Sequence, residues 1–272
     1  MPRANPATPT LIGLPYDASS SFLRGAAAAP PVIRQALHSA AGNSWTETGV
    51  DLGVDGALAD VGDVPLAGSS AEVRTKIEAS VRTLLESGGR PIVLGGDHSI
   101  TYPVIRAVRW SHPRLSVLHF DAHPDLYPEF AGDAYSHACP FSRVMEERLA
   151  DRLVQVGIRT MNAVQRTQAE RYGVDVIDMR AWVAGRRPRL EGPTYVSIDL
   201  DAFDPACAPG VSHREPGGLT ARDVLTVLQG LDVPLVGADV VEFNPAQDPS
   251  GVTAALCAKV VKELAGMMIA AR

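Results

Sequence analysis

Residues 117–125 (VLHFDAHPD) constrain the fold more than any other stretch, because an apolar run there ends abruptly in potential metal ligands. The β-forming run 117–120 indicates a buried parallel strand. Side chains two residues apart on an extended backbone point the same way, so Asp121, His123 and Asp125 are expected to converge. Open α/β sheets bind their ligands at the carboxyl ends of strands. The stretch therefore predicts such a strand with a polar site at its end.

Short apolar runs alternate with helical patterns along the rest of the chain. The expected strands are 11–15, 92–94, 115–120, 153–157, 174–178, 194–200 and 235–240, and the expected helices are 32–37, 71–87, 101–110, 140–150, 162–172, 221–230 and 252–269. Region 42–65 is expected to be mostly loop, with a possible edge strand near 57–61. Such alternation implies right-handed crossovers between parallel strands. The prediction is an α/β fold, with residues 1–272 forming a single-domain three-layer α/β/α structure around a central, mainly parallel sheet.

Composition narrows the classes of partner. The net charge is −6, with 46% hydrophobic and 21% charged residues, which is typical of a soluble globular protein. No block of Lys and Arg favours nucleic acid or an anionic membrane, and the acidic balance suits a small cationic substrate. Residues 1–10 lack the charged start and apolar core of a signal peptide, and no apolar run has the length of a membrane span. A cytosolic location is therefore expected.

The cysteines suggest neither a disulfide framework nor a thiolate zinc site. Cys139, Cys207 and Cys257 are odd in number and show no CxxC spacing. We expect buried or inert thiols.

Potential metal ligands lie at or just after the carboxyl ends of three of the expected strands. They are His98 after the first, Asp121, His123 and Asp125 after the second, and Asp199 and Asp201 after the third. Four carboxylates in one place repel one another unless cations neutralise them. Two divalent ions balance this charge, and oxygen-rich ligation with some imidazole favours manganese or magnesium over structural zinc, with manganese first. Such a pair of ions can share a water molecule and lower its pKa. Taken singly, each pair of ligands is more typical of a cap, a turn or a surface feature.

The motifs GGDHS (95–99), DAHPD (121–125) and SIDLDAFDP (197–205) resemble the three signatures of the ureohydrolases, the family of arginase and agmatinase. The resemblance extends to an N-terminal segment, residues 15–25, and to VEFNP (241–245). It implies an arginase-like fold and two Mn²⁺ per subunit. One ion would be bound by His98, Asp121, Asp125 and Asp199, and the other by Asp121, His123, Asp199 and Asp201. Asp121 and Asp199 would bridge the pair.

The resemblance also implies the catalytic residues. Asp125 would accept a proton from the attacking water and pass it to the departing amine, and His137 would act as a proton shuttle. Glu242 would bind the guanidinium, a planar cation that pairs well with a carboxylate. Simpler readings are a surface-loop histidine for His137 and a buried ion pair for Glu242. Asp204 is expected either to support the metal ligands or to form a turn, and not to bind metal itself.

Within the family the chain most resembles the plant-type arginases. L-arginine is the expected substrate, and agmatine or another guanidino acid is the alternative. Animal-type arginases carry Gly-Thr-Pro where this chain has Ser212, His213 and Arg214. Binding of an α-carboxylate needs a donor away from the metals. His213 or Arg214 could provide it, with help from Ser21 or Ser136, although an exposed or inter-subunit position is as plausible for Arg214.

Three other classes are weighed. A single-zinc deacylase would not need His98 or Asp125. A Cys/His amidine hydrolase would pair Cys139 with His137, but no oxyanion or base motif supports it. A non-catalytic metal scaffold would lack His137 or Glu242. Because ureohydrolases form trimers or hexamers, a homo-oligomer is expected.

Overall fold

The computed structural model describes residues 8–270, and eight strands in this part of the chain form one sheet. The strands are β1 (Pro9–Gly13), β2 (Ala59–Asp63), β3 (Arg90–Leu94), β4 (Ser116–Phe120), β5 (Arg152–Ile158), β6 (Asp175–Asp178), β7 (Thr194–Asp199) and β8 (Leu235–Val241). Their order is β2-β1-β3-β8-β7-β4-β5-β6, and every neighbouring pair is parallel. The predicted α/β class is confirmed, and the sheet is wholly parallel.

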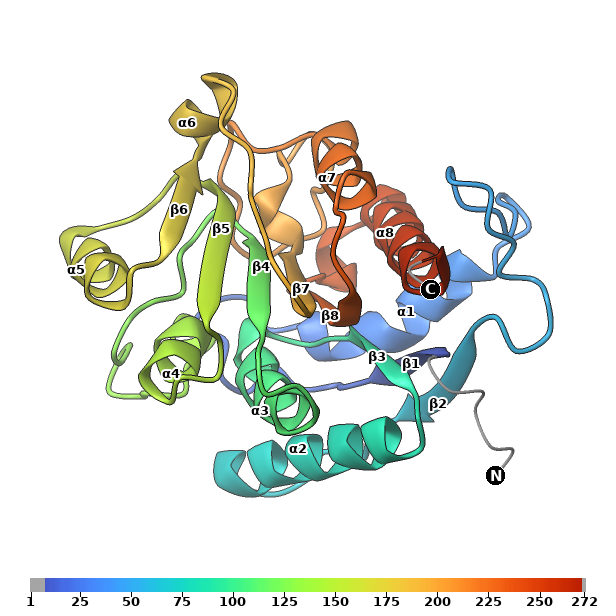
Figure 1. Cartoon of the computed structure of the whole chain (residues 1–272), viewed down its shortest axis with the longest axis horizontal. Coiled ribbons are helices and arrows are strands. Elements are labelled where there is room, and N and C mark those ends of the chain that lie inside the picture. Colours follow the sequence, from blue (N-terminus) through green and yellow to red (C-terminus); the bar gives the residue numbers. More distant parts are fainter. Residues whose placement is uncertain (1–7, 271–272) are drawn as a thin grey trace.

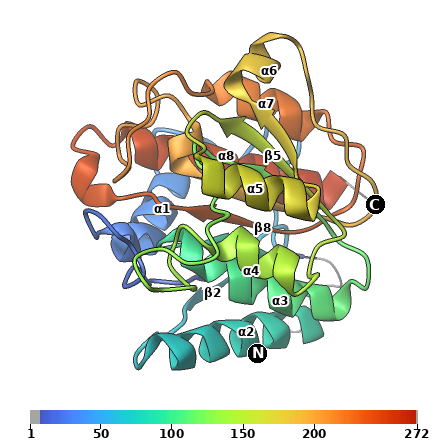
Figure 2. The same cartoon turned by 90° about the vertical axis from the view of Figure 1, so that its left-hand side faces the viewer.

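Helices cover both faces of the sheet (Figures 1 and 2). They are α1 (Ala29–Leu37), α2 (Ser70–Glu86), α3 (Thr101–Ser111), α4 (Pro140–Glu146), α5 (Ala163–Tyr172), α6 (Met179–Val183), α7 (Ala221–Gln229) and α8 (Val252–Ala270). The core on one face contains side chains from α1, α6, α7 and α8, and the core on the other contains side chains from α2, α3, α4 and α5. This is the three-layer arrangement that the alternating pattern predicts. None of the helices in residues 8–270 has the length and apolar character needed to cross a membrane.

Several boundaries differ from prediction for local reasons. Helix α4 ends at Glu146 and not at 150, because Arg148 adopts a left-handed conformation with φ of 54°. The first strand ends at Gly13, shortly before Pro15, which has no N–H for the ladder. Helix α6 was not predicted, and its first turn is capped by the side chain of Asp178. The expected edge strand exists as β2, and its side chains are mostly exposed.

The strand order brings four carboxyl ends together. The chain passes from β3 to β4 across two intervening positions, which β8 and β7 later fill. Ends that are distant in sequence therefore become neighbours in the order β3, β8, β7, β4. Sites in open α/β sheets form at such a change of direction.

Candidate active site

The six predicted metal ligands lie together at this edge of the sheet. They occupy the start of the 3₁₀ helix η2 (His98–Ile100) after β3, the loop after β4 (Asp121, His123, Asp125), the last residue of β7 (Asp199) and the 3₁₀ helix η3 (Leu200–Ala202), which contains Asp201. All are buried except His123, whose side chain is 26% exposed. Three strand ends thus contribute to one polar cluster.

One half of the cluster surrounds the imidazole of His98. Its Nδ1 lies 3.0 Å from Asp125 Oδ2, 3.2 Å from Asp199 Oδ2 and 3.3 Å from Asp121 Oδ2. This buried nitrogen makes no properly oriented hydrogen bond. Adjacent ligand atoms about 2.1 Å from an octahedral ion lie about 3.0 Å from one another, so each of these oxygens lies from Nδ1 at the spacing of two ligands of one ion. The donor set fits a divalent cation.

The other half surrounds His123. Its Nδ1 lies 3.0 Å from Asp201 Oδ2 and 3.4 Å from Asp121 Oδ1. These three residues present ligand atoms close enough to hold an ion. Because Asp121 turns Oδ2 towards His98 and Oδ1 towards His123, its carboxylate lies between the two halves.

A buried hydrogen-bond chain orients the His98 ring. Asp239 accepts hydrogen bonds from Ser197 Oγ at 2.6 Å, Tyr195 OH at 2.8 Å and Thr101 Oγ1 at 2.9 Å. The only hydroxyl proton of Ser197 is used on Asp239, so its oxygen accepts from His98 Nε2, 3.0 Å away. With the proton on Nε2, the Nδ1 lone pair faces the three carboxylates, as a metal ligand requires.

Charge in the cluster also favours cations. Burial and neighbouring carboxylates raise the pKa of Asp201 to about 6 and raise the pKa of Asp199 well above its ordinary value. Burial lowers the pKa of His98, but the three carboxylates close to Nδ1 outweigh it and raise that pKa overall. The cluster therefore retains protons that metal ions would displace.

Two of the predicted catalytic residues have strained backbones. Asp125 and Glu242 adopt φ angles of 49° and 62°, a left-handed region that costs about 1–3 kcal/mol for residues other than glycine. Glu242 is held there by a hydrogen bond from its N–H to Gly96 O at 2.9 Å. A Cβ on Gly96 would lie 1.7 Å from Tyr16 O, so only glycine allows the loops to approach this closely.

Glu242 and His137 form a buried pair beside the metal cluster. Glu242 Oε1 accepts hydrogen bonds from His98 N at 2.9 Å and from His137 Nδ1 at 3.1 Å. Within residues 8–270, no donor reaches Oε2. Although burial lowers it, the pKa of His137 is raised overall to about 9 by Glu242, whose own pKa is lowered by the same contact. His137 Nε2 is 2.9 Å from Ser21 Oγ, so both ring nitrogens have partners.

A cavity of about 280 Å³ joins these groups. Its lining includes four residues of the metal cluster (His123, Asp125, Asp199 and Asp201), the His137–Glu242 pair, Ser21 and His213. Tyr127, Phe130, Thr160, Asn162 and Gln165 also line it. The sequence analysis did not predict these last five residues. They lie in the loop after β4, in the loop after β5 and at the start of α5, and only the sheet order brings these segments together.

Of the four residues predicted to bind the substrate tail, Ser21 and His213 line this cavity, and Ser136 and Arg214 do not. The His213 ring lies 5.2 Å from that of His137, and burial with the nearby positive charge lowers the pKa of His213. Arg214 points elsewhere, with Nε bonded to Pro209 O at 2.9 Å and Nη2 to Gln247 Oε1 at 3.1 Å. Ser136 is buried outside the lining. Arg214 and Ser136 are therefore not supported as tail donors.

The arginase family model matches residues 7–266. This chain belongs to the arginase family. It is 48% identical to "Arginase 1, mitochondrial" of Arabidopsis thaliana over 277 residues, covering 95% of this chain and 80% of that protein. The agmatinase of Chromobacterium violaceum is 35% identical, covering 94% of this chain and 82% of that protein. The solved arginase of Medicago truncatula superposes with a TM-score of 0.91 at 44% identity, covering 97% and 88% of the two chains.

This arginase-family chain is therefore an enzyme, a hydrolase that acts on linear amidines. The structure gives the alternative cysteine mechanism no support, because both nitrogens of His137 are bonded elsewhere and Cys139 Sγ contacts Asp133 O at 3.6 Å. Burial raises the pKa of the Cys139 thiol to about 12. Cys139 and Cys257 are buried and all three cysteines are free, as expected.

Asp204 forms a turn, accepting hydrogen bonds from the N–H groups of residues 206, 217 and 218.

The expected cytosolic location is wrong. The Arabidopsis and Medicago relatives are named as mitochondrial, and a second Arabidopsis arginase is named as chloroplastic/mitochondrial. A compartment is specified by a short address that a receptor reads, and not by the composition of the folded part. The composition of residues 1–10, of which 1–7 lie outside the described structure, was therefore a poor guide.

Proposed function

We propose that this protein is an arginase that hydrolyses L-arginine to L-ornithine and urea. The observation that carries the proposal is the 48% identity to a plant arginase over 95% of the chain. The cavity supports it, because a carboxylate suited to a guanidinium lies beside a metal-binding cluster.

We propose two Mn²⁺ per subunit as the cofactor. One would be held by His98, Asp121, Asp125 and Asp199, and the other by Asp121, His123, Asp199 and Asp201, so that Asp121 and Asp199 would contribute to both. Carboxylate and imidazole donors without thiolate suit manganese. Asp121 supports the bridging role, since each of its oxygens faces a different histidine.

The chain's own residues would bind and orient the substrate. When bound, a pair of divalent ions supplies a water of lowered pKa and positive charge for the developing oxyanion. Glu242 lines the cavity with its negative charge, and no donor of residues 8–270 reaches Oε2, so this oxygen can accept guanidinium N–H groups. This contact would hold the guanidinium carbon towards Asp125. Asp125 lines the same cavity and would carry a proton from the water to the leaving nitrogen.

His137 would exchange protons between the cavity and the departing amine. It keeps its proton at neutral pH because Glu242 faces Nδ1. Ser21 Oγ, next to Nε2, is a hydroxyl that can both accept and donate. The pair would therefore return a proton to the site after each turnover.

Agmatine is the alternative substrate, and one observation favours it. Among residues 8–270, no Lys or Arg side chain lines the cavity, and both ring nitrogens of the charged His137 already have partners, so the other donors available to the arginine carboxylate are neutral. His213 is proposed as one such donor, since its neutral imidazole lies on the cavity wall. Agmatine lacks the carboxylate and needs no such contact.

The proposed assembly is a homo-oligomer, a trimer or a hexamer, of chains that each form one domain. Light scattering tests it, and a monomer at micromolar concentration would contradict it.

The decisive experiment compares urea release from L-arginine and from agmatine after the purified protein is loaded with Mn²⁺ and excess metal is removed. Higher kcat/KM for arginine supports the proposal. Higher kcat/KM for agmatine would replace it with agmatinase. No urea from either substrate would refute both.

A further inference from the structure

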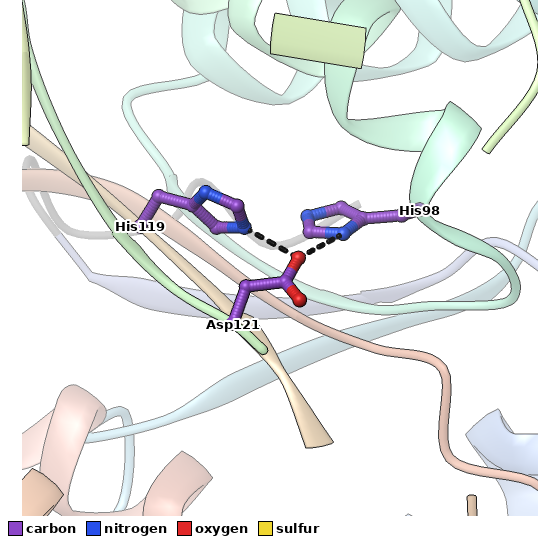
Figure 3. Close-up of side chains that lie close together, drawn as sticks. All are labelled: His98, His119 and Asp121. Atoms are coloured by element: carbon purple, nitrogen blue, oxygen red, sulfur yellow. Dashed lines mark hydrogen bonds and ion pairs between the residues drawn. The ribbon is translucent and has the colours of Figure 1, made fainter. Parts of the chain in front are cut away.

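His119 is a third histidine of the metal cluster to which the proposed mechanism gives no role. His119 lies on β4, two residues before Asp121 in the sequence, and its side chain is fully buried. Figure 3 shows His98 and His119 aimed at the same carboxylate of Asp121. His119 Nε2 lies 2.8 Å from Asp121 Oδ2, and His98 Nδ1 lies 3.3 Å from that oxygen. The three residues could hold an ion, so His119 is either another ligand or a hydrogen-bond donor.

The hydrogen bonds of Gln155 on β5 decide whether His119 is a ligand or a donor. It is the direct partner of His119 in the β4–β5 register. Its Nε2 lies 2.6 Å from Pro124 O and 3.0 Å from His119 Nδ1. A carbonyl oxygen can only accept, so the amide nitrogen and not the amide oxygen must face Pro124. The orientation of the Gln155 amide is thereby fixed.

Proton counting then fixes the tautomer of His119. The second N–H of the Gln155 amide points to His119 Nδ1, which must accept it and cannot carry a proton. The ring proton of the neutral imidazole is therefore on Nε2, where it is donated to Asp121 Oδ2. A nitrogen that carries a proton has no lone pair for a metal. The opposite tautomer would require a flipped amide, which sets Gln155 Oε1 against Pro124 O.

We propose that His119 is a positioning residue and not a metal ligand, and that Gln155 sets its tautomer for this purpose. The proposal rests on the proposed dinuclear metal site. His119 holds one oxygen of Asp121, while the N–H of His123 holds the other at 2.6 Å. Phe141 packs on the His119 ring at 4.0 Å between centroids. The bridging carboxylate thus has a fixed plane before any cation binds, which lowers the reorganisation that metal binding needs.

Nitrogen NMR of the metal-free protein tests the tautomer directly. We expect the two ¹⁵N signals of His119, assigned by their loss in His119→Gln, to show a protonated Nε2 and an unprotonated Nδ1. In Gln155→Leu the share of this form should fall, because only the Asp121 carboxylate still favours it, whereas Gln168→Leu on α5 should leave it unchanged. A protonated Nδ1 in the wild-type protein would overturn the proposal. Because no metal is present, this result does not depend on the proposed function.

Metal titration tests the role. His119→Gln keeps an N–H donor near the position of Nε2, and His119→Leu removes it. We expect both variants to bind two equivalents of Mn²⁺ at saturation, with affinity about 10–100-fold weaker for His119→Leu and close to wild type for His119→Gln. Saturation at one equivalent in both variants would make His119 a ligand and refute the proposal. If the wild-type protein itself bound no pair of ions, the proposed function would fail and the tautomer result would still stand.

Discussion

Substitution of Ser197 gives the sharpest test of how the His98 ring is oriented in the metal cluster. The substitution Ser197→Ala removes the hydroxyl that links His98 to Asp239 and changes the side-chain volume little. Two buried groups then lose partners, because Asp239 loses the 2.6 Å bond and His98 Nε2 loses its 3.0 Å acceptor. A hydrogen bond to a carboxylate contributes about 1.5–3 kcal/mol, and an unsatisfied buried N–H costs about 1–3 kcal/mol. We therefore expect the free energy of unfolding of the metal-free protein to fall by roughly 3–5 kcal/mol.

Ser116→Ala is the matched control. Ser116 is also buried, and its hydroxyl donates one bond to Glu191 O at 2.8 Å, but it lies at the start of β4, away from the cluster. Loss of one neutral hydrogen bond should cost about 1 kcal/mol. The assay is denaturant unfolding of metal-free protein at one fixed concentration, followed by Mn²⁺ titration of each variant.

The metal titration separates the effect on the orientation of His98 from the effect on the stability of the fold. With its acceptor lost, His98 no longer has one favoured tautomer, and we expect the Mn²⁺ affinity to weaken about 10–100-fold in Ser197→Ala. Ser116→Ala should bind metal like the wild type. If the two variants matched in both stability and metal affinity, the hydrogen-bond chain from Asp239 would have no orienting role.

Three other predictions concern the cluster and its neighbours. His123→Ala should bind about one equivalent of Mn²⁺ fewer by elemental analysis and lose most activity, and an unchanged metal count would remove His123 from the ligand set. In metal-free protein, NMR titration of His137 should give a pKa near 9. In Glu242→Gln this pKa should fall, because burial still disfavours the imidazolium and the partner charge is gone; an unchanged value would exclude Glu242 as the cause. Chelation should lower the Tm, since ions at 100 times their Kd stabilise the fold by about 2.7 kcal/mol per site, and an unchanged Tm would argue against metal bound in the folded state.

Prediction from sequence succeeded where the signal was local. Alternate spacing after a strand places Asp121, His123 and Asp125 in one loop, and the structure brings them together with His98, Asp199 and Asp201. His119 continues the same spacing towards the N-terminus, so the pattern could have included it. Its partner Gln155 carried no such signal, because nothing in a single strand shows which residue lies opposite it.

Backbone conformation was also beyond the sequence pattern. The left-handed conformations of Asp125 and Glu242 are usual for glycine and uncommon for acids, so residue type gave no warning of them. They persist because non-local hydrogen bonds hold them, such as that from Glu242 N to Gly96 O.

The sequence by itself determined the α/β class, the strands that carry ligands and the charge that calls for cations. Those properties follow from the twofold repeat of a strand and from the ionisation of side chains, which need no knowledge of distant contacts. Only the tertiary structure decided that β8 lies between β3 and β7, which places Glu242 beside His98 and His137. Strand order is set by how crossovers pack both faces of the sheet, a property of the whole chain that no single segment encodes.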